Sequence, residues 1–315
     1  QMCIRDRYLF TVEKSEFIWF DGELVDWDSA QINVMTHTLH YGTGVFEGIR
    51  ARNTEKGVSI FRLNDHVDRL FASADSYNLK IPYTKEVIFE AIKDVVSKNK
   101  LQSAYIRPLV FFGEGEMGLL PKDVPVRVSI AAWYWGAYLG DDAVNQGVNV
   151  CISRWRRISP TSFIPLAKGV GGYMNSTLAK IDAVENGYDD AIMLGDDGTV
   201  AEGSGQNIFI VKDNNIFTPP NSTGALNGIT RRTVIEIAEQ KNIPIEEKNL
   251  TVEDLKTADE VFFTGTATGV IGVVSIDKGD ISDGQVGKIT SDIIDSYEDV
   301  VNAKDDNFKS YITLI

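Results

Sequence analysis

Two tight turns in the second half of the chain limit how its strands can pair. Asp196-Asp197-Gly198 and Asn214-Asn215 each separate short strand-like runs. Strands joined so tightly pair antiparallel, because a parallel pair needs a crossover of about a dozen residues or more. The sequence therefore predicts an α+β fold rather than a doubly wound parallel sheet.

Turn chemistry and apolar periodicity predict the other elements. Asp21-Gly22 between two apolar runs is typical of a hairpin. Asn64 and Thr84 are candidate N-caps of helices that run to about Tyr77 and Lys98. The remaining predicted strands span about 104–112, 126–135, 148–154, 190–194, 206–211, 259–264 and 270–276, and the remaining helices about 173–185, 229–241 and 285–302.

The length of 315 residues predicts two domains, each large enough to bury a core. The polar stretch 136–147, which contains Gly and Asp, is the best candidate for a linker. It would separate an N-terminal domain over 17–135 from a C-terminal domain over 148–315. Residues 1–16 begin with Gln and lack the apolar centre of a signal peptide, so we interpret them as an appended extension without function.

Composition argues against several classes of function. A net charge of −14 is opposite to what nucleic acid requires of a partner. No apolar run reaches the ~18 residues of a membrane-spanning helix. Three histidines and two cysteines without ligand spacing predict no metal site. The low cysteine content also implies no disulfide framework and favours a reducing, cytoplasmic location.

Lys168 lies in an unusually apolar and small setting. Ile164-Pro-Leu-Ala precedes it, and Gly169, Gly171, Gly172 and Tyr173 follow. An amine in apolar surroundings loses its proton more easily and becomes nucleophilic. The glycines would also let a flat ligand approach the backbone. This setting suits a lysine that forms an imine with a carbonyl compound, and a plain surface-loop lysine is the alternative.

Three other segments would supply matching groups. Glu202 is the one carboxylate in the small stretch 199–207, where it would either face a protonated ring nitrogen or lie in an exposed turn. Residues 226–232 open a helix whose first N–H groups and Thr230 hydroxyl would form a phosphate cradle, or simply a capped helix. The small residues at 264–269 offer a further anion nest.

Gly113, Gly115 and Gly118 match the dinucleotide-binding pattern G-x-G-x-x-G. We reject that interpretation, because two glutamates inside the pattern would face a pyrophosphate and Pro121 follows where a helix should begin. The sequence favours a turn between two strands instead.

Two arginines stand among apolar or small residues. Arg50 ends the aromatic-containing stretch 41–50, and Arg107 lies within 104–108. Arginine in such surroundings commonly binds a carboxylate or phosphate through two parallel hydrogen bonds. A structural ion pair is the competing explanation.

Together these segments resemble the fold-type IV pyridoxal-phosphate enzymes, most closely the branched-chain amino acid aminotransferases. The resemblance runs from about 17 to 287 and rests on six segments in the same order. They are His-Tyr-Gly-Thr-Gly-Val-Phe-Glu-Gly-Ile-Arg at 40–50, Ser-Ala-Tyr-Ile-Arg-Pro at 103–108, Trp-Gly-Ala-Tyr-Leu-Gly at 135–140, Ala-Lys-Gly-Val-Gly-Gly-Tyr at 167–173, Ala-Glu-Gly-Ser-Gly-Gln-Asn at 201–207 and Gly-Ile-Thr-Arg at 228–231.

The resemblance implies a role for each site residue. Lys168 would hold pyridoxal 5′-phosphate as an imine and shuttle a proton, Glu202 would keep the ring nitrogen protonated, and Tyr173 would hydrogen-bond the phenolic oxygen. The cofactor phosphate would be bound by Arg69, the Ile229 backbone, Thr230 and Thr266. The substrate carboxylate and side chain would be bound by Tyr105, Thr266, Ala267, Phe46, Arg50, Arg107, Trp135 and Tyr138. Tyr41 and Leu119 would reach into a neighbouring subunit, which makes a homodimer the minimum unit.

The implied activity is reversible, ping-pong transfer of the amino group of L-leucine, L-isoleucine or L-valine to 2-oxoglutarate. The implied fold is a small α/β N-terminal domain and a larger C-terminal pseudo-barrel. D-amino acid transaminases and aminodeoxychorismate lyases share that fold, but the aromatic stretches 41–50 and 135–138 favour aliphatic L-side chains. A binding protein that has lost catalysis is disfavoured by the presence of both Lys168 and Glu202.

Two positions depart from the family's pattern. Gln206 stands where some relatives have a second glutamate, which reduces the negative charge near the cofactor. Thr268-Gly269 replaces the Ala-Glu pair expected in many bacterial members, which affects the expected substrate range.

Overall fold

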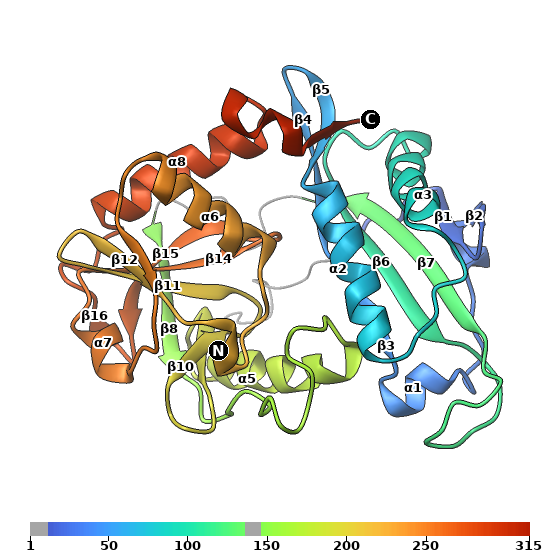
Figure 1. The fold of residues 1–315 in the computed structure, drawn as a ribbon, viewed down its shortest axis with the longest axis horizontal. Helices are drawn as coiled ribbons and strands as arrows, with labels where there is room; N and C mark the ends of the chain where they lie inside the picture. Colours follow the sequence, from blue (N-terminus) through green and yellow to red (C-terminus); the bar gives the residue numbers. More distant parts are fainter. Residues whose placement is uncertain (1–11, 136–145) are drawn as a thin grey trace, which may run out of the picture.

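The computed structural model describes residues 12–135 and 146–315, which form two lobes side by side (Figure 1). The first lobe contains an antiparallel sheet and three helices. Its strands are β1 (Phe17–Phe20), β2 (Glu23–Asp26), β3 (Gly44–Phe46), β4 (Ile49–Thr54), β5 (Gly57–Phe61), β6 (Ala104–Phe112), β7 (Val126–Tyr134) and β17 (Ile312–Leu314), and its helices are α1 (His37–Tyr41), α2 (Leu63–Ser76) and α3 (Lys85–Lys98). The strand order is β17-β5-β4-β6-β7-β1-β2, with β3 paired to β6.

The second lobe is built on a mixed sheet that curls into a half-barrel. Its strands are β8 (Val148–Ile152), β9 (Asp190–Leu194), β10 (Val200–Gly203), β11 (Asn207–Lys212), β12 (Asn215–Thr218), β13 (Ile245–Glu247), β14 (Glu260–Gly265), β15 (Gly269–Ile276) and β16 (Gly279–Asp280), and its helices are α5 (Tyr173–Glu185), α6 (Ile229–Gln240), α7 (Val252–Lys256) and α8 (Lys288–Val301). The order is β10-β9-β8-β15-β14-β11-β12-β13, with β16 paired to β15. Strand β8 pairs parallel with β9 and β15, and β12 pairs parallel with β13.

The predicted turns are confirmed. Asp21-Gly22 closes the β1–β2 hairpin, and the two tight turns join the antiparallel pairs β9–β10 and β11–β12. The α+β fold of two sheets follows as predicted. The glycine pattern at 113–118 lies in the connection between β6 and β7, and no helix follows it.

The predicted start of α2 is wrong by two positions. Arg62, not Asn64, precedes the first helical residue, in a left-handed conformation with φ 54° and without a side-chain cap. Its backbone N–H donates to the Tyr311 carbonyl at 2.7 Å. A tertiary contact therefore sets the helix start, where sequence reasoning looked for a local cap. Thr84, by contrast, does cap α3 by accepting the Val87 N–H.

The end of the chain returns to the first lobe. Strand β17 pairs antiparallel with β5, so the C-terminal residues complete the N-terminal sheet (Figure 1). Arg62 stabilises the position of this C-terminal segment, because its guanidinium lies 3.8 Å from the centre of the Tyr311 ring. The same guanidinium forms ion pairs with Asp65 and with Glu236 of α6. One buried arginine thus joins both lobes and the C-terminal segment.

Each lobe has its own apolar core. In the first, Leu70 of α2 and Ile92 of α3 are fully buried with the sheet residues Ile49 and Ile106. In the second, helices α6 and α8 cover one face of the sheet, where the Phe209 and Phe262 rings stack 4.9 Å apart. Because the apolar side chains pack inside each lobe, polar groups line the space between the lobes. Within 12–135 and 146–315, no helix is long and apolar enough to cross a membrane.

We predict that Arg62→Met destabilises the fold without touching the site. Its side chain is only 3% exposed, whereas its partners Asp65 and Glu236 are 26% and 36% exposed. The loss should be roughly 1–3 kcal/mol, below the ~3–5 kcal/mol of a fully buried pair, because both carboxylates stay partly hydrated. Denaturant unfolding measures it. Lys80→Met, which breaks an exposed pair with Asp75, is the control and should change stability by under about 0.5 kcal/mol. Equal unfolding free energies for Arg62→Met and the wild type would contradict the anchoring role.

Candidate active site

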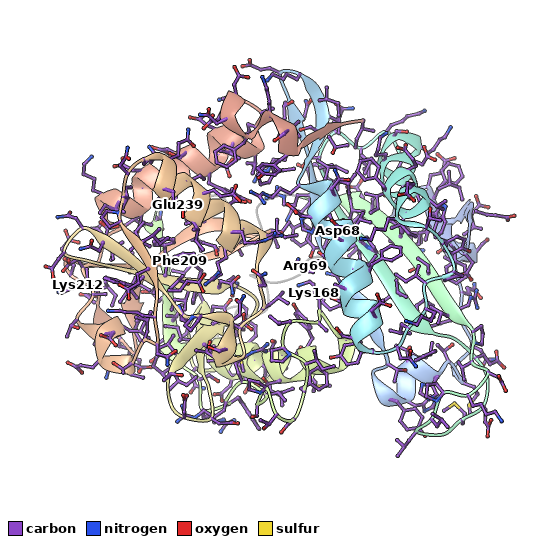
Figure 2. The ribbon with its side chains drawn as sticks, in the orientation of Figure 1. Asp68, Arg69, Lys168, Phe209, Lys212 and Glu239 are labelled. Atoms are coloured by element: carbon purple, nitrogen blue, oxygen red, sulfur yellow. The ribbon has the colours of Figure 1, made fainter. Side chains whose placement is uncertain are left out.

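A polar pocket lies where the two lobes meet. The empty space within it, open solvent at the mouth included, is about 740 Å³. Figure 2 labels Lys168 and Arg69 close together at this junction. The lining residues that carry the argument are Arg69, Tyr105, Arg157, Lys168, Tyr173, Glu202, Gln206, Asn207, Leu226, Gly228, Ile229, Thr230, Thr264, Thr266 and Ala267.

Two backbone hydrogen bonds hold Lys168 in place, so its side-chain amine is not needed to anchor the residue. Its N–H donates to the Ser73 hydroxyl at 3.0 Å, and its carbonyl accepts the Phe46 N–H at 3.0 Å. The side-chain Nζ donates to the Tyr173 hydroxyl at 2.6 Å. Tyr173 is the first residue of α5, so the helix fixes that hydroxyl in place. The structure thus brings the Lys168 amine and the Tyr173 hydroxyl into contact, while the expected bond from Tyr173 to a phenolic oxygen stays a prediction.

The glycines after Lys168 serve the protein rather than a ligand. A Cβ on Gly169 would lie 2.7 Å from the Tyr77 hydroxyl, and one on Gly172 would lie 2.8 Å from the Phe163 ring. Neither glycine lines the pocket that holds the Lys168 amine. For Gly169 and Gly172 the expectation that they admit a flat ligand is wrong, because Tyr77 and Phe163 lie there, whereas a Cβ on Gly171 would meet the Gly42 backbone at 3.3 Å.

Glu202 is buried on the lining of the pocket that also holds Lys168, not exposed in a turn. Its Oε1 pairs with the Arg157 guanidinium at 2.8 Å, and its Oε2 accepts the Leu226 N–H at 3.0 Å and the Asn207 amide at 3.4 Å. Burial raises the pKa of the Glu202 carboxyl above its usual value, against the opposing effects of Arg157 and the Leu226 N–H. The described lining of the site thus contains one carboxylate and one lysine amine.

The start of α6 forms an anion cradle on the same pocket. Its N-cap is Gly228, which supplies no side-chain acceptor, so the first N–H groups of the helix lack partners from the helix itself. Thr230 and Thr266 line the pocket beside them. The buried Thr264 hydroxyl also has no hydrogen-bond partner within the described structure. These unpaired donors fit a phosphate group.

Arg69 adds a cation to this cradle. Its Nε and Nη2 donate to Glu47 at 2.6 and 2.9 Å, and its Nη1 donates to the Asn227 carbonyl at 3.1 Å. Three of the five guanidinium N–H donors are used, which leaves two for a phosphate. Burial alone would raise the pKa of the Glu47 carboxyl, but Arg69 and His66 lower it well below its usual range. Arg69 is thus a rigid, charge-balanced donor.

The expected substrate-binding residues divide into three groups. Tyr105, Thr266 and Ala267 line the pocket. Phe46, Arg107 and Trp135 adjoin it. The Arg107 guanidinium lies 4.6 Å from the Phe46 ring centre and donates to the Tyr105 hydroxyl at 3.2 Å, and the Trp135 ring lies 4.5 Å from that of Tyr105.

The remaining expected residues lie elsewhere. Arg50 lines a neighbouring smaller pocket with Arg52, His66 and Tyr297, and burial followed by the charge of Arg52 lowers its pKa to about 10. The structure therefore does not place Arg50 in the main pocket. Tyr41 and Leu119 are 42% and 87% exposed, on the surface of the first lobe. Tyr138 and most of the predicted linker 136–147 lie outside the described residues.

Sequence reasoning missed Glu47 and Arg157. Glu47 stands between Phe46 and Gly48 and is completely buried, so the argument that singled out Glu202 applied to it equally. Arg157 is one of three arginines within 154–157, and nothing in the sequence separates it from the other two. Within the described ranges no cluster of three or more His, Cys, Asp or Glu side chains could hold a metal ion.

The sequence and the fold both match known proteins. The family described as amino-transferase class IV matches residues 44–276. The branched-chain-amino-acid aminotransferase of Pseudomonas aeruginosa is 46% identical over 303 residues, which cover 96% of this chain and 98% of that protein. The enzyme of the same name from Escherichia coli K12 is 43% identical over 90% of this chain and 92% of its own length.

Solved structures agree. The crystal structure of the Escherichia coli branched-chain amino acid aminotransferase superposes with a TM-score of 0.93 at 40% identity and covers 95% of this chain and 99% of that one. The T.th. enzyme of the same name, solved with pyridoxamine 5′-phosphate, gives a TM-score of 0.93 at 41% identity, over 96% and 99% of the two chains. A family match over most of the chain, together with relatives this similar over nearly its full length, shows that the chain belongs to the class IV aminotransferases.

Proposed function

We propose that this protein is a branched-chain amino acid transaminase, which exchanges the amino group of L-leucine, L-isoleucine or L-valine with 2-oxoglutarate. The observation that carries the proposal is the placement of the Lys168–Tyr173 pair and Glu202 around one pocket, in a chain 46% identical to a protein of that name. Pyridoxal 5′-phosphate is the cofactor. When bound, it supplies the electron sink that stabilises negative charge at the substrate Cα.

The chain's own groups bind and orient that cofactor. Arg69, Thr230, Thr266 and the first N–H groups of α6 would hold its phosphate. Glu202 would face the ring nitrogen from one side of the pocket. Tyr173 would hold the phenolic oxygen through the hydroxyl that now contacts the Lys168 Nζ. These three sets of contacts from the protein would together orient the bound cofactor.

Lys168 then moves the proton. Its Nζ would be the base that takes up the substrate's Cα proton and the acid that gives it back, since it is the one lysine amine on the described pocket lining. The 2.6 Å contact with the Tyr173 hydroxyl holds this amine in place within the pocket. Oxo acid release and a second half-cycle with 2-oxoglutarate complete the ping-pong exchange.

The substrate would be bound by its two ends. Tyr105 and the backbone at Thr266 and Ala267 would bind its carboxylate, and Phe46 with Trp135 would surround an aliphatic side chain. Arg107 lies at the edge of this apolar wall. Its guanidinium could pair with the distal carboxylate of glutamate, which the same pocket must accept in the other half-cycle.

We also propose a homodimer. Four large apolar side chains stand out on one surface of the first lobe, Val34, Leu39, Leu119 and Leu120, at 76%, 60%, 87% and 77% exposure. Helix α1 joins the loop that carries the last two, because the His37 ring bonds the Gly118 carbonyl at 2.8 Å. An apolar surface of this kind favours burial against a second copy. Tyr41 and Leu119 would then approach the partner's site.

The division into domains at 17–135 and 148–315 stays a prediction, as does a cytoplasmic location. The pairing of β17 with β5 supports a division in which the last strand belongs to the N-terminal unit.

We expect borohydride reduction of the loaded protein to leave the cofactor on Lys168, located by peptide mass mapping. Lys168→Ala should retain the fold and bind the cofactor through its phosphate, yet lose turnover by at least roughly 10³-fold, because nucleophile and proton carrier are one group. Lys168→Arg keeps a cation there and controls for charge. Cofactor found on any other lysine would reject the assignment.

Arg107→Met should separate the two half-reactions. The glutamate half should lose roughly 2–4 kcal/mol of transition-state stabilisation, the scale of losing a charged hydrogen-bond partner, while the leucine half keeps its apolar contacts. Single-turnover kinetics with each amino acid measure both. An equal loss in the two halves would mean that Arg107 only supports Phe46 and Tyr105.

Leu39→Glu combined with Leu119→Glu should give a monomer with little activity. Two charges in an apolar interface cost more than the interface can offset, and each site would lose the partner's residues. Light scattering and turnover are the measurements. Val87→Glu, at an exposed position on α3, is the matched control and should stay dimeric. A double variant that remains a dimer would place the interface elsewhere.

A further inference from the structure

The hydrogen-bond donors around Glu202 favour the ionised form of its carboxyl. A carboxylate offers about four lone-pair positions. Three donors of this chain already point at them, from Arg157, Leu226 and Asn207. A protonated carboxyl would carry its hydrogen at the one remaining position and would then have no lone pair left for a further donor. The arrangement therefore leaves one acceptor position for a donor inside the pocket.

Arg157 is the cation that this arrangement depends on. Among the described residues, it alone lies within ion-pair distance of Glu202, and the two side chains are only 14% and 8% exposed. Its Nη1 donates to the Ser176 hydroxyl of α5 at 3.3 Å, and its backbone N–H donates to the Leu194 carbonyl of β9 at 2.9 Å. Two regular elements thus hold the guanidinium against Glu202.

Gln206 lines the same pocket without adding a second carboxylate to it. The Gln206 amide donates to Asp190 at 3.1 Å, and Asp190 already pairs with Lys180 at 3.0 Å. A glutamate at 206 would set two buried carboxylates against each other, so the amide suits this position. Glu202 is consequently the one carboxylate among the described pocket-lining residues, beside three cations, Arg69, Arg157 and Lys168.

We propose that Arg157 is a positioning residue that determines where the proton between Glu202 and the cofactor's ring nitrogen resides. The proposal rests on the proposed function, since that function supplies the ring nitrogen. With the guanidinium present, the carboxylate is the stable form of Glu202, and the proton stays on nitrogen. Without it, a buried and unpaired carboxyl retains the proton on its own oxygen. Arg157 thereby keeps the ring electron-poor without touching it.

The direct test measures the protonation state of the ring nitrogen itself. Wild type, Arg157→Met and Arg157→Lys are loaded with pyridoxal 5′-phosphate labelled with ¹⁵N in the ring, and the ¹⁵N chemical shift is recorded at neutral pH. The wild type should show a protonated ring nitrogen and Arg157→Met an unprotonated one. Arg157→Lys keeps the charge and should restore most of the protonated signal. Arg157→Met should still fold, because Glu202 can neutralise itself by taking up a proton.

Arg62→Met is the matched control, since it removes a buried, ion-paired arginine that does not line the pocket. It should lower stability and leave the ¹⁵N shift unchanged. A wild-type shift in Arg157→Met, an unprotonated nitrogen in the wild type, or the same altered shift in Arg62→Met would each overturn the proposal.

A double-mutant cycle gives a second test of the proposal, by kinetics. Single-turnover loss of the Cα proton from L-leucine should slow about tenfold to a hundredfold in Arg157→Met, the scale of losing a hydrogen bond to a charged group. Glu202→Gln should slow it at least as much, and adding Arg157→Met to Glu202→Gln should cost nothing more, because Arg157 acts only through Glu202. Additive losses would overturn the proposal. A wild type that neither binds the cofactor nor transaminates would instead reject the proposed function.

Discussion

The buried charge of Glu47 fixes how the two lobes meet at the site. Its side chain is fully excluded from water, and Arg69 and His66 together compensate its charge. Arg69 in turn bonds the Asn227 carbonyl, two residues before α6 begins. The guanidinium therefore spans from a helix of the first lobe to the anion cradle of the second. Loss of either partner would leave a charge buried and unpaired, which is far costlier than losing a surface pair.

The pocket has the opposite electrostatic character to the chain as a whole. The protein carries a formal net charge of −14, yet the described lining holds three cations and one carboxylate. A positive recess on an acidic protein concentrates anions where they are needed and repels them elsewhere. The phosphate, the substrate carboxylate and the distal carboxylate of glutamate are all anions. Glu202 is the one carboxylate on this lining, and it is held by the Leu226 N–H, close to the segment that begins α6.

Local signals in the sequence predicted the parts of the fold that local interactions form. The tight turn at Asp196-Asp197-Gly198 and the Thr84 cap involve neighbours in the chain, and both are present. The start of α2 and the position of β17 depend on contacts between Arg62 and Tyr311, which are far apart in the sequence. No residue near either one in the sequence therefore predicts them.

For the site, the resemblance predicted that Lys168, Tyr173 and Glu202 share one pocket, and the structure brings them together there. It did not point to Glu47 or Arg157, because their ionic partners lie far along the chain and only the folded structure brings them into contact. It also assigned Arg50 to the substrate, whereas the structure places that side chain in a neighbouring pocket.

The proposed function requires one chemical event, the transfer of an amino group from a branched-chain L-amino acid to the bound cofactor. The most direct measurement mixes the loaded protein with L-leucine alone, without 2-oxoglutarate, and follows the cofactor's absorption together with the oxo acid released. We expect one oxo acid per site and complete conversion of the cofactor to its amine form, with no change on adding D-leucine instead. Conversion by D-leucine but not L-leucine, or no conversion by either, would contradict the central claim.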